Sequence, residues 1–191
     1  MKKVLVIGAG GSLATHVIEA LKPLENVELT LFVRNKSRLS KSISEGCTII
    51  EGDAMNYNDV KNAVAKMNIV YVNLAGNLEA MAKNIIKAMR ETTVKRIIAI
   101  SSIGIYDIPL RAVLVPYRKL ADVIESSGLD YTILRPDWFT NANEIDYSLT
   151  HKSEPEKGSA ISRKSIAAFI ARIIETPELH KNENLGISKP D

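Results

Sequence analysis

Four small residues lie close together in the stretch VLVIGAGGSLATHV near the start of the chain. They are Gly8, Gly10, Gly11 and Ala14, and they follow a run of apolar residues and precede a segment of helical period. Glycines in such a turn let the backbone come within contact distance of a phosphate, and the N-terminus of the next helix offers free N–H groups and positive dipole charge. The spacing is G-x-x-G-x-x-A, and the strict G-x-G-x-x-G pattern fails at Leu13. We predict a dinucleotide-phosphate cradle; the alternative is a βα turn with a purely structural role.

The end of the second apolar run carries positive charge. The stretch LFVRNKSRLSK contains Arg34, Lys36, Arg38 and Lys41, and the first acid after it is Glu45. A carboxylate about 20 residues beyond the glycines would bind the adenosine ribose hydroxyls and select NAD. A guanidinium at this place can instead bind a 2′-phosphate through two parallel hydrogen bonds. The pattern therefore favours NADP(H) over NAD(H), and the alternative is a solvated basic loop.

The elements that must position these residues alternate regularly along the chain. Segments with apolar residues at helical spacing, such as Leu13, Val17 and Leu21, separate short apolar runs rich in Val and Ile. Continuous apolar runs are typical of strands buried on both faces of a parallel sheet. We predict one doubly wound α/β Rossmann domain over residues 1–191, with a parallel sheet of strand order 3-2-1-4-5-6 and helices on both faces. The six predicted strands lie in residues 3–8, 28–33, 47–52, 68–76, 95–102 and 130–136.

Composition argues against several classes of protein. The net charge of +3 is small and the basic residues are spread along the chain, so we expect no nucleic-acid partner. No stretch approaches the roughly 18 apolar residues of a membrane span, and the apolar run at the start is too short for a signal peptide. One cysteine, Cys47, cannot form an internal disulfide, so we expect a reducing cytoplasm. The three histidines lack metal-ligand spacing, so we expect no metal site.

Several stretches resemble, in the same order, those of one enzyme family. They are GAGGSLATHVI, EGDAMNYNDVKNAV, VKRIIAISSIGIYD, SGLDYTILRPDWFT and ISRKSIAAFIARII, and they cover nearly the whole chain. The chain resembles the atypical short-chain dehydrogenases/reductases, in particular the NmrA-like NAD(P)H-binding branch that includes flavin- and biliverdin-reductase-like proteins. The SGLDYTILRP block is the most distinctive of these stretches.

This resemblance implies cofactor contacts at the ends of the predicted strands. Asp53 would bind the adenine edge, with Ala54 packed beside it; the alternative for Asp53 is the N-cap of the next turn. Small residues after the fourth strand would line the ribose, because the cofactor lies against the carboxyl ends of the strands. Pro136 would pass near the nicotinamide. The cofactor residues that we expect are Gly8, Gly10, Gly11, Ser12, Leu13, Arg34, Asp53, Ala54, Leu74, Ala75, Gly76, Ser101 and Pro136.

The resemblance also implies residues on the substrate side. Ser102 matches a serine that hydrogen-bonds a substrate carbonyl in relatives with an SSxxxYG pattern, and Tyr106 matches its tyrosine, with Asp107 in place of the glycine. Residues 137–139 (Asp-Trp-Phe) would form part of the substrate-side wall. The alternative for the two aromatic residues of this segment is core or interface packing.

A tyrosine and a lysine in VPYRKLADVI raise the question of proton transfer. Short-chain dehydrogenases that reduce carbonyls carry Tyr-x-x-x-Lys, which places both side chains on one helix face, so that the ammonium lowers the pKa of the phenol. Tyr117 and Lys119 are i and i+2, about 200° apart around a helix, and cannot form this pair. Counting back from SGLDYTILRP, the family's lysine falls near Tyr117 and its tyrosine near Val113.

Two functions remain open from these residues. The first is an NADPH-dependent reductase that passes hydride to a flavin, quinone or tetrapyrrole-like acceptor, which takes its proton from solvent. Its catalytic candidates are Ser102, Tyr106 and Tyr117, the last beside the nicotinamide ribose. The second is a regulatory protein of NmrA-like type, in which NADP(H) binding shifts a conformation or a protein interaction without turnover. The partner is accordingly a small-molecule acceptor or another protein.

Overall fold

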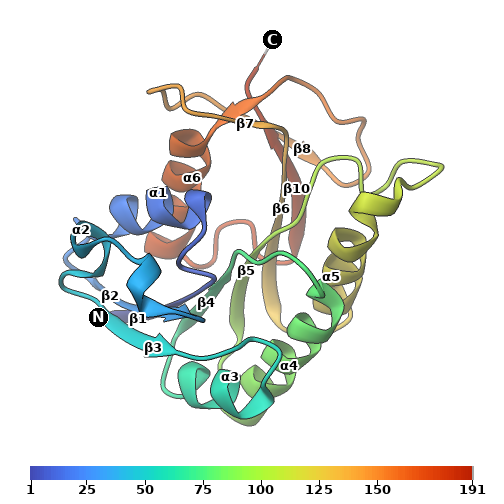
Figure 1. Ribbon diagram of the computed structural model, residues 1–191. Helices are drawn as coiled ribbons and strands as arrows, with labels where there is room; N and C mark the ends of the chain where they lie inside the picture. Colours follow the sequence, from blue (N-terminus) through green and yellow to red (C-terminus); the bar gives the residue numbers. More distant parts are fainter. Residues whose placement is uncertain (191) are drawn as a thin grey trace.

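The computed structural model describes residues 1–190, and a mostly parallel sheet forms its centre (Figure 1). The six expected apolar runs all form strands; β1, β4 and β5 are buried because helices cover both faces of the sheet, whereas β3 at the sheet edge is largely exposed. The sheet order begins β3-β2-β1-β4-β5-β6, so the predicted order is confirmed. The strands are β1 (Lys2–Ile7), β2 (Val27–Val33), β3 (Thr48–Glu51), β4 (Ile69–Val72), β5 (Arg96–Ile100) and β6 (Asp130–Pro136).

Two further strands extend the sheet beyond β6. Strand β10 (Glu183–Ser188) pairs parallel to β6, and β8 (Ser148–His151) pairs antiparallel to β10 at the edge. The sequence prediction missed both. Their stretches, ENLGIS and SLTH, contain Asn, Gly, Ser, Thr and His and have no continuous apolar run, although β10 is buried along most of its length. Pairing with β6 makes β10 a strand, and its own propensity does not.

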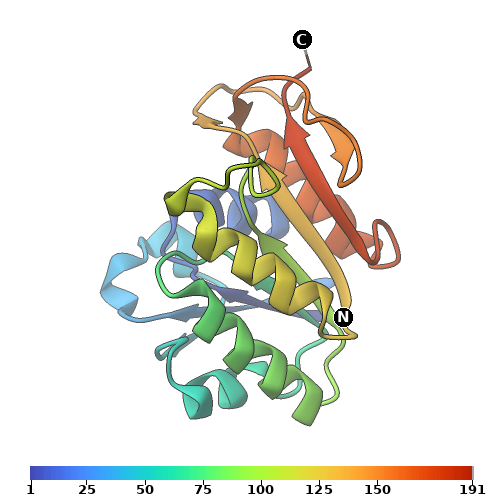
Figure 2. The ribbon, with the colours of Figure 1, turned by 90° about the vertical axis from the view of Figure 1, so that its right-hand side faces the viewer.

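Helices cover both faces of the sheet (Figure 2). One face carries α1 (Ser12–Leu21), α6 (Arg163–Glu175) and the short α2 (Lys41–Ser44). The other carries α3 (Tyr57–Val64), α4 (Leu78–Glu91) and α5 (Val115–Glu125). The core therefore has two apolar layers, one on each side of the sheet, as expected for a doubly wound fold.

A small second sheet lies near the carboxyl ends of the central strands. Strand β7 (Phe139–Thr140) pairs with β9 (Ile161–Ser162), and α6 begins at the next residue, Arg163. Ser162 caps α6, because its hydroxyl accepts a hydrogen bond from the Ser165 N–H at 2.9 Å. This arrangement places the first turn of α6 directly beside β7. None of the helices among residues 1–190 is long and apolar enough to cross a membrane.

One buried hydroxyl, that of Tyr71 in β4, has no hydrogen-bond partner among the described residues. Its side chain is fully buried in the layer under α1 and α6. Burial without a partner raises the pKa of the Tyr71 hydroxyl, because the phenolate would lose its solvation. The hydroxyl therefore contributes an uncompensated desolvation cost to the folded state.

Replacing Tyr71 by Phe should raise the free energy of unfolding by about 1 kcal/mol, since the ring stays and only the unpaired hydroxyl is removed. Urea denaturation of the purified protein measures this change. Tyr57→Phe is the matched control, because the Tyr57 hydroxyl hydrogen-bonds to Glu91. A lower urea midpoint for Tyr71→Phe than for the wild type would contradict the prediction.

Candidate functional site

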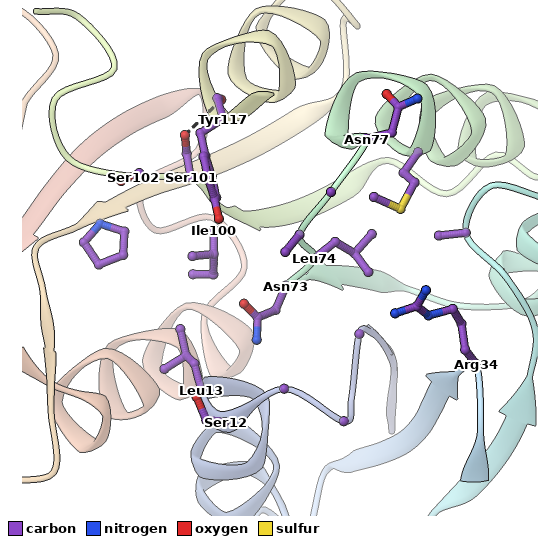
Figure 3. Close-up of a pocket in the computed structure, with 18 of the residues that line it drawn as sticks. Ser12, Leu13, Arg34, Asn73, Leu74, Asn77, Ile100, Ser101, Ser102 and Tyr117 are labelled. Carbon is purple, nitrogen blue, oxygen red and sulfur yellow. Dashed lines mark hydrogen bonds between the residues drawn. The ribbon is translucent and has the colours of Figure 1, made fainter. Parts of the chain in front are cut away.

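A pocket of about 1190 Å³ opens at the carboxyl ends of the parallel strands. It crosses the boundary between β1 and β4, where the strand order reverses, which is the place at which doubly wound folds bind their ligands. Figure 3 shows part of its lining, which comes from the loops after β1, β2, β3, β4 and β5, from the end of β6 and from α5. All the site residues predicted from sequence line this pocket, with the exception of Tyr106.

Gly8 and Gly10 of the glycine-rich turn are glycines for two different structural reasons. Gly8 has φ +87°, and a Cβ there would lie 2.1 Å from the carbonyl oxygen of Asn73, so Gly8 is required by the protein itself. A Cβ on Gly10 would meet no atom within 4 Å. Gly10 instead borders open pocket space, which a phosphate can approach only if no side chain occupies it. Gly11 is the N-cap of α1, with no side-chain capping bond and no acid in the first turn. The turn therefore fits an anion at the α1 N-terminus.

Two arginines after β2 carry positive charge into the same pocket. Arg34 and Arg38 line it and are exposed, and among residues 1–190 neither forms an ion pair. Lys36 between them is paired with Glu51 at 3.6 Å. The Asn35 side chain accepts from the Ser37 N–H at 2.9 Å and so caps the 3₁₀ turn Lys36–Arg38. Arg38 ends this capped turn and lines the same pocket as Arg34.

Asp53 and Ala54 lie in the loop between β3 and α3 and line the pocket. One carboxylate oxygen of Asp53 accepts from the Met55 N–H at 2.9 Å, so the side chain does cap the turn, as the alternative interpretation proposed. The Asn84 side chain of α4 donates to the carbonyl oxygens of Ala54 and Met55 at 3.1 and 3.0 Å. These two hydrogen bonds fix the loop to α4, and the loop contributes Asp53 and Ala54 to the pocket lining.

Leu74, Ala75 and Gly76 continue the lining after β4, as predicted. The sequence analysis missed Asn73, which comes directly before them. Its carbonyl lies against Gly8, and its side-chain amide would be 3.1 Å from a Cβ on Gly11. A polar side chain is unusual at the end of a buried strand, and this feature of the sequence could have identified Asn73.

Ser101, Ser102 and Tyr117 meet at the other end of the pocket (Figure 3). The Ser101 hydroxyl donates to the Tyr117 carbonyl oxygen at 3.1 Å and so ties the end of β5 to α5. The Ser102 hydroxyl has only a local bond, to the Ile103 carbonyl oxygen at 3.2 Å. The Tyr117 side chain extends from α5 toward Ile100. Ser102 and Tyr117 are therefore the hydroxyls placed to contact a ligand here.

Lys119 lies on another side of α5, as its spacing from Tyr117 predicted. Its ammonium forms an ion pair with Glu79 of α4 at 2.7 Å. Lys119 and Lys83 together lower the pKa of the Glu79 carboxyl to about 2, because both hydrogen-bond to the charged form. Tyr117 and Lys119 thus do not form a catalytic pair. Val113 and Tyr117, near which the resemblance places the family's tyrosine and lysine, both line the pocket.

Tyr106 requires a correction, because the structure does not bring it into the pocket. Its hydroxyl accepts from the Asn184 side chain at 2.7 Å and lies 3.4 Å from a carboxylate oxygen of Glu125. Burial, and then the charge of Glu125, raise the pKa of Tyr106, whereas a proton-donating tyrosine needs a lowered one. The SSxxxYG match predicted its place in the sequence and could not show which way the side chain turns.

A buried ion pair holds the loop that carries Ser102. Arg135 of β6 is 1% exposed, and its Nε donates to Glu156 at 2.6 Å. The other oxygen of Glu156 accepts from the Gly104 N–H at 3.0 Å, and the Arg135 guanidinium also donates to Asn184. The sequence analysis did not single out Arg135 or Glu156, although an arginine inside the apolar run DYTILRP was a signal of a buried charge.

The far wall of the pocket is apolar and open. Trp138 is 77% exposed and Val113 is 69% exposed, and both line the pocket with Phe139. Core packing is therefore the wrong interpretation of Trp138, whereas the two other interpretations, interface packing and a substrate-side wall, both agree with its exposure. We call Trp138 and Phe139 the acceptor wall. Arg111 lines the same end and adds a positive charge.

Comparison with known proteins agrees with this geometry. Residues 8–177 match a family described as NAD(P)H-binding, from the glycine turn to the end of α6. The chain belongs to this NAD(P)H-binding family. The nicotinamide cofactor expected from the glycine turn is therefore confirmed.

Several solved structures and curated proteins are similar to this chain. A Rossmann-fold NAD(P)-binding protein from Shigella flexneri is 46% identical with a TM-score of 0.91, and the match covers 100% of this chain and 94% of that one. A short-chain dehydrogenase/reductase from Veillonella parvula, solved in complex with NADP, is 26% identical with a TM-score of 0.90 over 99% and 95% of the two chains. An isoflavone reductase homolog A622-like protein of Nicotiana tabacum is 27% identical over 154 residues, 73% of this chain. The chain spans 49% of that relative's length. The expected resemblance to short-chain dehydrogenases is confirmed.

Proposed function

We propose that this protein is an NADPH-dependent reductase that passes hydride to a flat acceptor, a flavin or quinone, without a Tyr–Lys pair. One observation carries the proposal. A single pocket runs from Arg34 and Arg38, past the glycine turn, to Ser102 and the acceptor wall. Its volume exceeds the range of about 300–1,000 Å³ of sites for one drug-sized ligand. A pocket larger than the site of one drug-sized ligand supports binding of a dinucleotide with an acceptor beside it.

The residues along the pocket favour one orientation of a bound dinucleotide, with the adenosine at one end and the nicotinamide at the other. Arg34 and Arg38 suit a 2′-phosphate, and the α1 N-terminus beside Gly10 suits the pyrophosphate. Ser102, Tyr117 and Pro136 then stand at the nicotinamide end, at the tips of β5, α5 and β6. When bound there, NADPH supplies the hydride, and the protein orients it toward the acceptor wall.

The acceptor end favours a flat and largely apolar molecule. Exposed Trp138 and Val113 offer apolar surface, and Arg111 offers a cation for an acidic substituent. Flavins and quinones can take their proton from solvent after hydride transfer, so a tuned tyrosine is unnecessary. We expect this chemistry in a reducing, cytoplasmic setting.

A second function is favoured by Val113 and Tyr117, because the resemblance places the usual catalytic tyrosine and lysine near these two positions. In that case NADP(H) binding alone would shift a conformation or a protein interaction, without turnover. The difference between the two functions is measurable as consumption of NADPH.

The decisive experiment follows the absorbance of NADPH with purified protein and a panel of flavins and quinones. We expect oxidation of NADPH well above the protein-free rate with at least one acceptor. Binding without oxidation across the panel would contradict the reductase and leave the regulatory function. No cofactor binding by calorimetry would contradict both.

Replacing Tyr117 by Phe tests the proton route. General acid catalysis contributes roughly 10²–10⁴-fold, so loss of an essential proton donor would lower kcat by that factor. We expect a fall of less than about tenfold with the best acceptor, because solvent supplies the proton. A fall of a hundredfold or more in kcat, with an unchanged urea midpoint, would show that the Tyr117 hydroxyl is the donor.

A further inference from the structure

One arginine outside the pocket lining contacts two separate parts of the site. Arg163 is the first residue of α6, and its Nε donates to the Ser12 hydroxyl at 3.3 Å. Ser12 is the first residue of α1 and lines the pocket at the phosphate turn. The two residues are 151 positions apart in sequence, so only the fold brings them together.

The same guanidinium also holds the acceptor wall. It lies 5.1 Å from the centre of the Phe139 ring, within cation–π distance. It donates to the Thr140 carbonyl oxygen at 3.3 Å and to the Asn141 side chain at 2.9 Å. Arg163 thus connects the phosphate turn to β7 and the residues that follow it.

The charge of Arg163 is not compensated by the protein. Its partners are a hydroxyl, a carbonyl, an amide and a ring, all neutral. In the described part of the chain no carboxylate forms an ion pair with it, whereas Arg118 and Arg135 each have one. A partly buried guanidinium with only neutral partners beside a phosphate turn leaves its charge free for an anion.

We propose that Arg163 is a pyrophosphate-binding and positioning residue, which supplies positive charge at the α1 N-terminus and fixes β7 against the bound cofactor. This inference rests on the proposed cofactor site. The pyrophosphate is common to NADPH and NADH, so Arg163 acts on both dinucleotides. Arg34, in contrast, acts on the 2′-phosphate that only NADPH carries. Because Arg163 also holds Phe139, cofactor binding and the order of the acceptor wall are linked.

The test measures binding of NADPH and NADH separately, by calorimetry, to the wild type and to Arg163→Ala. We expect the Kd for each dinucleotide to rise by the same factor, about tenfold, since a charge-assisted contact to a phosphate is lost. Arg163→Gln keeps polar contacts without charge and should show the same loss, and Arg163→Lys should recover part of it. Arg172→Ala is the matched control, an exposed arginine on the same helix that does not share the contacts of Arg163 with Ser12 and Phe139. It should bind as the wild type does.

The outcomes are distinct from those for the proposed function. If the wild type binds neither dinucleotide, the cofactor site itself is wrong. If the wild type binds and both Arg163→Ala and Arg163→Gln bind as tightly, only the role of Arg163 is overturned. A loss confined to NADPH would also overturn it, because the contact would then be to the 2′-phosphate. Should Arg163→Ala fail to fold, the Gln and Lys variants give the same comparison.

The link to the acceptor wall has its own signal, because Trp138 is the only tryptophan in the sequence. We expect saturating NADP⁺ to change the Trp138 emission of the wild type and to change that of Arg163→Gln less. An equal change at saturation in both proteins would overturn the positioning part of the proposal.

Discussion

Replacing Arg34 by Asp should weaken NADPH binding by about a hundredfold and leave NADH binding nearly unchanged. Hydrogen bonds to a charged group contribute about 1.5–3 kcal/mol, and a hundredfold change in Kd equals about 2.7 kcal/mol. The substituted carboxylate would also repel the 2′-phosphate and can hydrogen-bond the ribose hydroxyls of NADH. The reason for choosing Arg34 is that it lines the pocket and has no ion-pair partner among residues 1–190. Calorimetric titration with each dinucleotide measures both constants.

The matched control for this prediction is Lys41→Asp. Lys41 belongs to the same basic stretch and undergoes the same change of charge, but it does not line the pocket. It should leave the ratio of the two affinities close to that of the wild type. An equal loss of NADPH and NADH affinity in Arg34→Asp would show that Arg34 does not bind the 2′-phosphate. An equal ratio in Arg34→Asp and Lys41→Asp would show that only the general charge of the loop matters.

Alanine at Gly8 should lower the free energy of unfolding, whereas alanine at Gly10 should weaken dinucleotide binding and leave the free energy of unfolding nearly unchanged. Gly8→Ala places a Cβ 2.1 Å from the Asn73 carbonyl oxygen at a φ of +87°. The left-handed backbone costs an L-residue about 1–2 kcal/mol, and relief of such a clash adds about 1–3 kcal/mol. The free energy of unfolding should therefore fall by about 2–5 kcal/mol, a large part of the stability of an ordinary domain. Urea denaturation without cofactor measures it.

Gly10→Ala should fold as the wild type does, because its Cβ meets no protein atom within 4 Å. Its urea midpoint should stay equal or rise slightly, since alanine lowers the entropy of the unfolded chain. The new methyl group occupies the space that a phosphate needs, so we expect the Kd for both dinucleotides to rise by about tenfold or more. Unchanged binding in Gly10→Ala would place the pyrophosphate elsewhere, and an unchanged midpoint in Gly8→Ala would contradict the close approach to Asn73.

Where the apolar pattern was continuous, the sequence was sufficient to predict the elements. The six Val- and Ile-rich runs form six strands in the predicted order. A strand buried on both faces, such as β4, needs apolar residues at every position, whereas β3 lies at the sheet edge and is largely exposed. The glycine turn and the basic stretch after β2 were also predictable, since in this fold both loops follow parallel strands that end at the same edge. The i, i+2 spacing was enough to separate Tyr117 from Lys119, because helical rotation is a local property.

Other parts of the molecule depend on contacts between distant segments. Strand β10 forms because β6 offers it an edge, although ENLGIS carries no strand pattern of its own. The direction of Tyr106 depends on Asn184, which lies on β10 and was not recognised as part of any site. The ion pair of Arg135 with Glu156 likewise joins a strand to a polar loop 21 residues away.

What the sequence by itself determined is the parallel sheet, the cofactor cradle and the absence of a Tyr-x-x-x-Lys pair in the stretch VPYRKLADVI. All three follow from local patterns, namely continuous burial, backbone freedom at glycine and helical spacing. What only the tertiary structure decided is which side chains face the pocket at its acceptor end. Trp138 and Tyr117 enter it, Tyr106 turns away, and Arg163 reaches Ser12 from 151 residues away. Side-chain direction there depends on which polar partners the fold places nearby, and no local pattern encodes those partners.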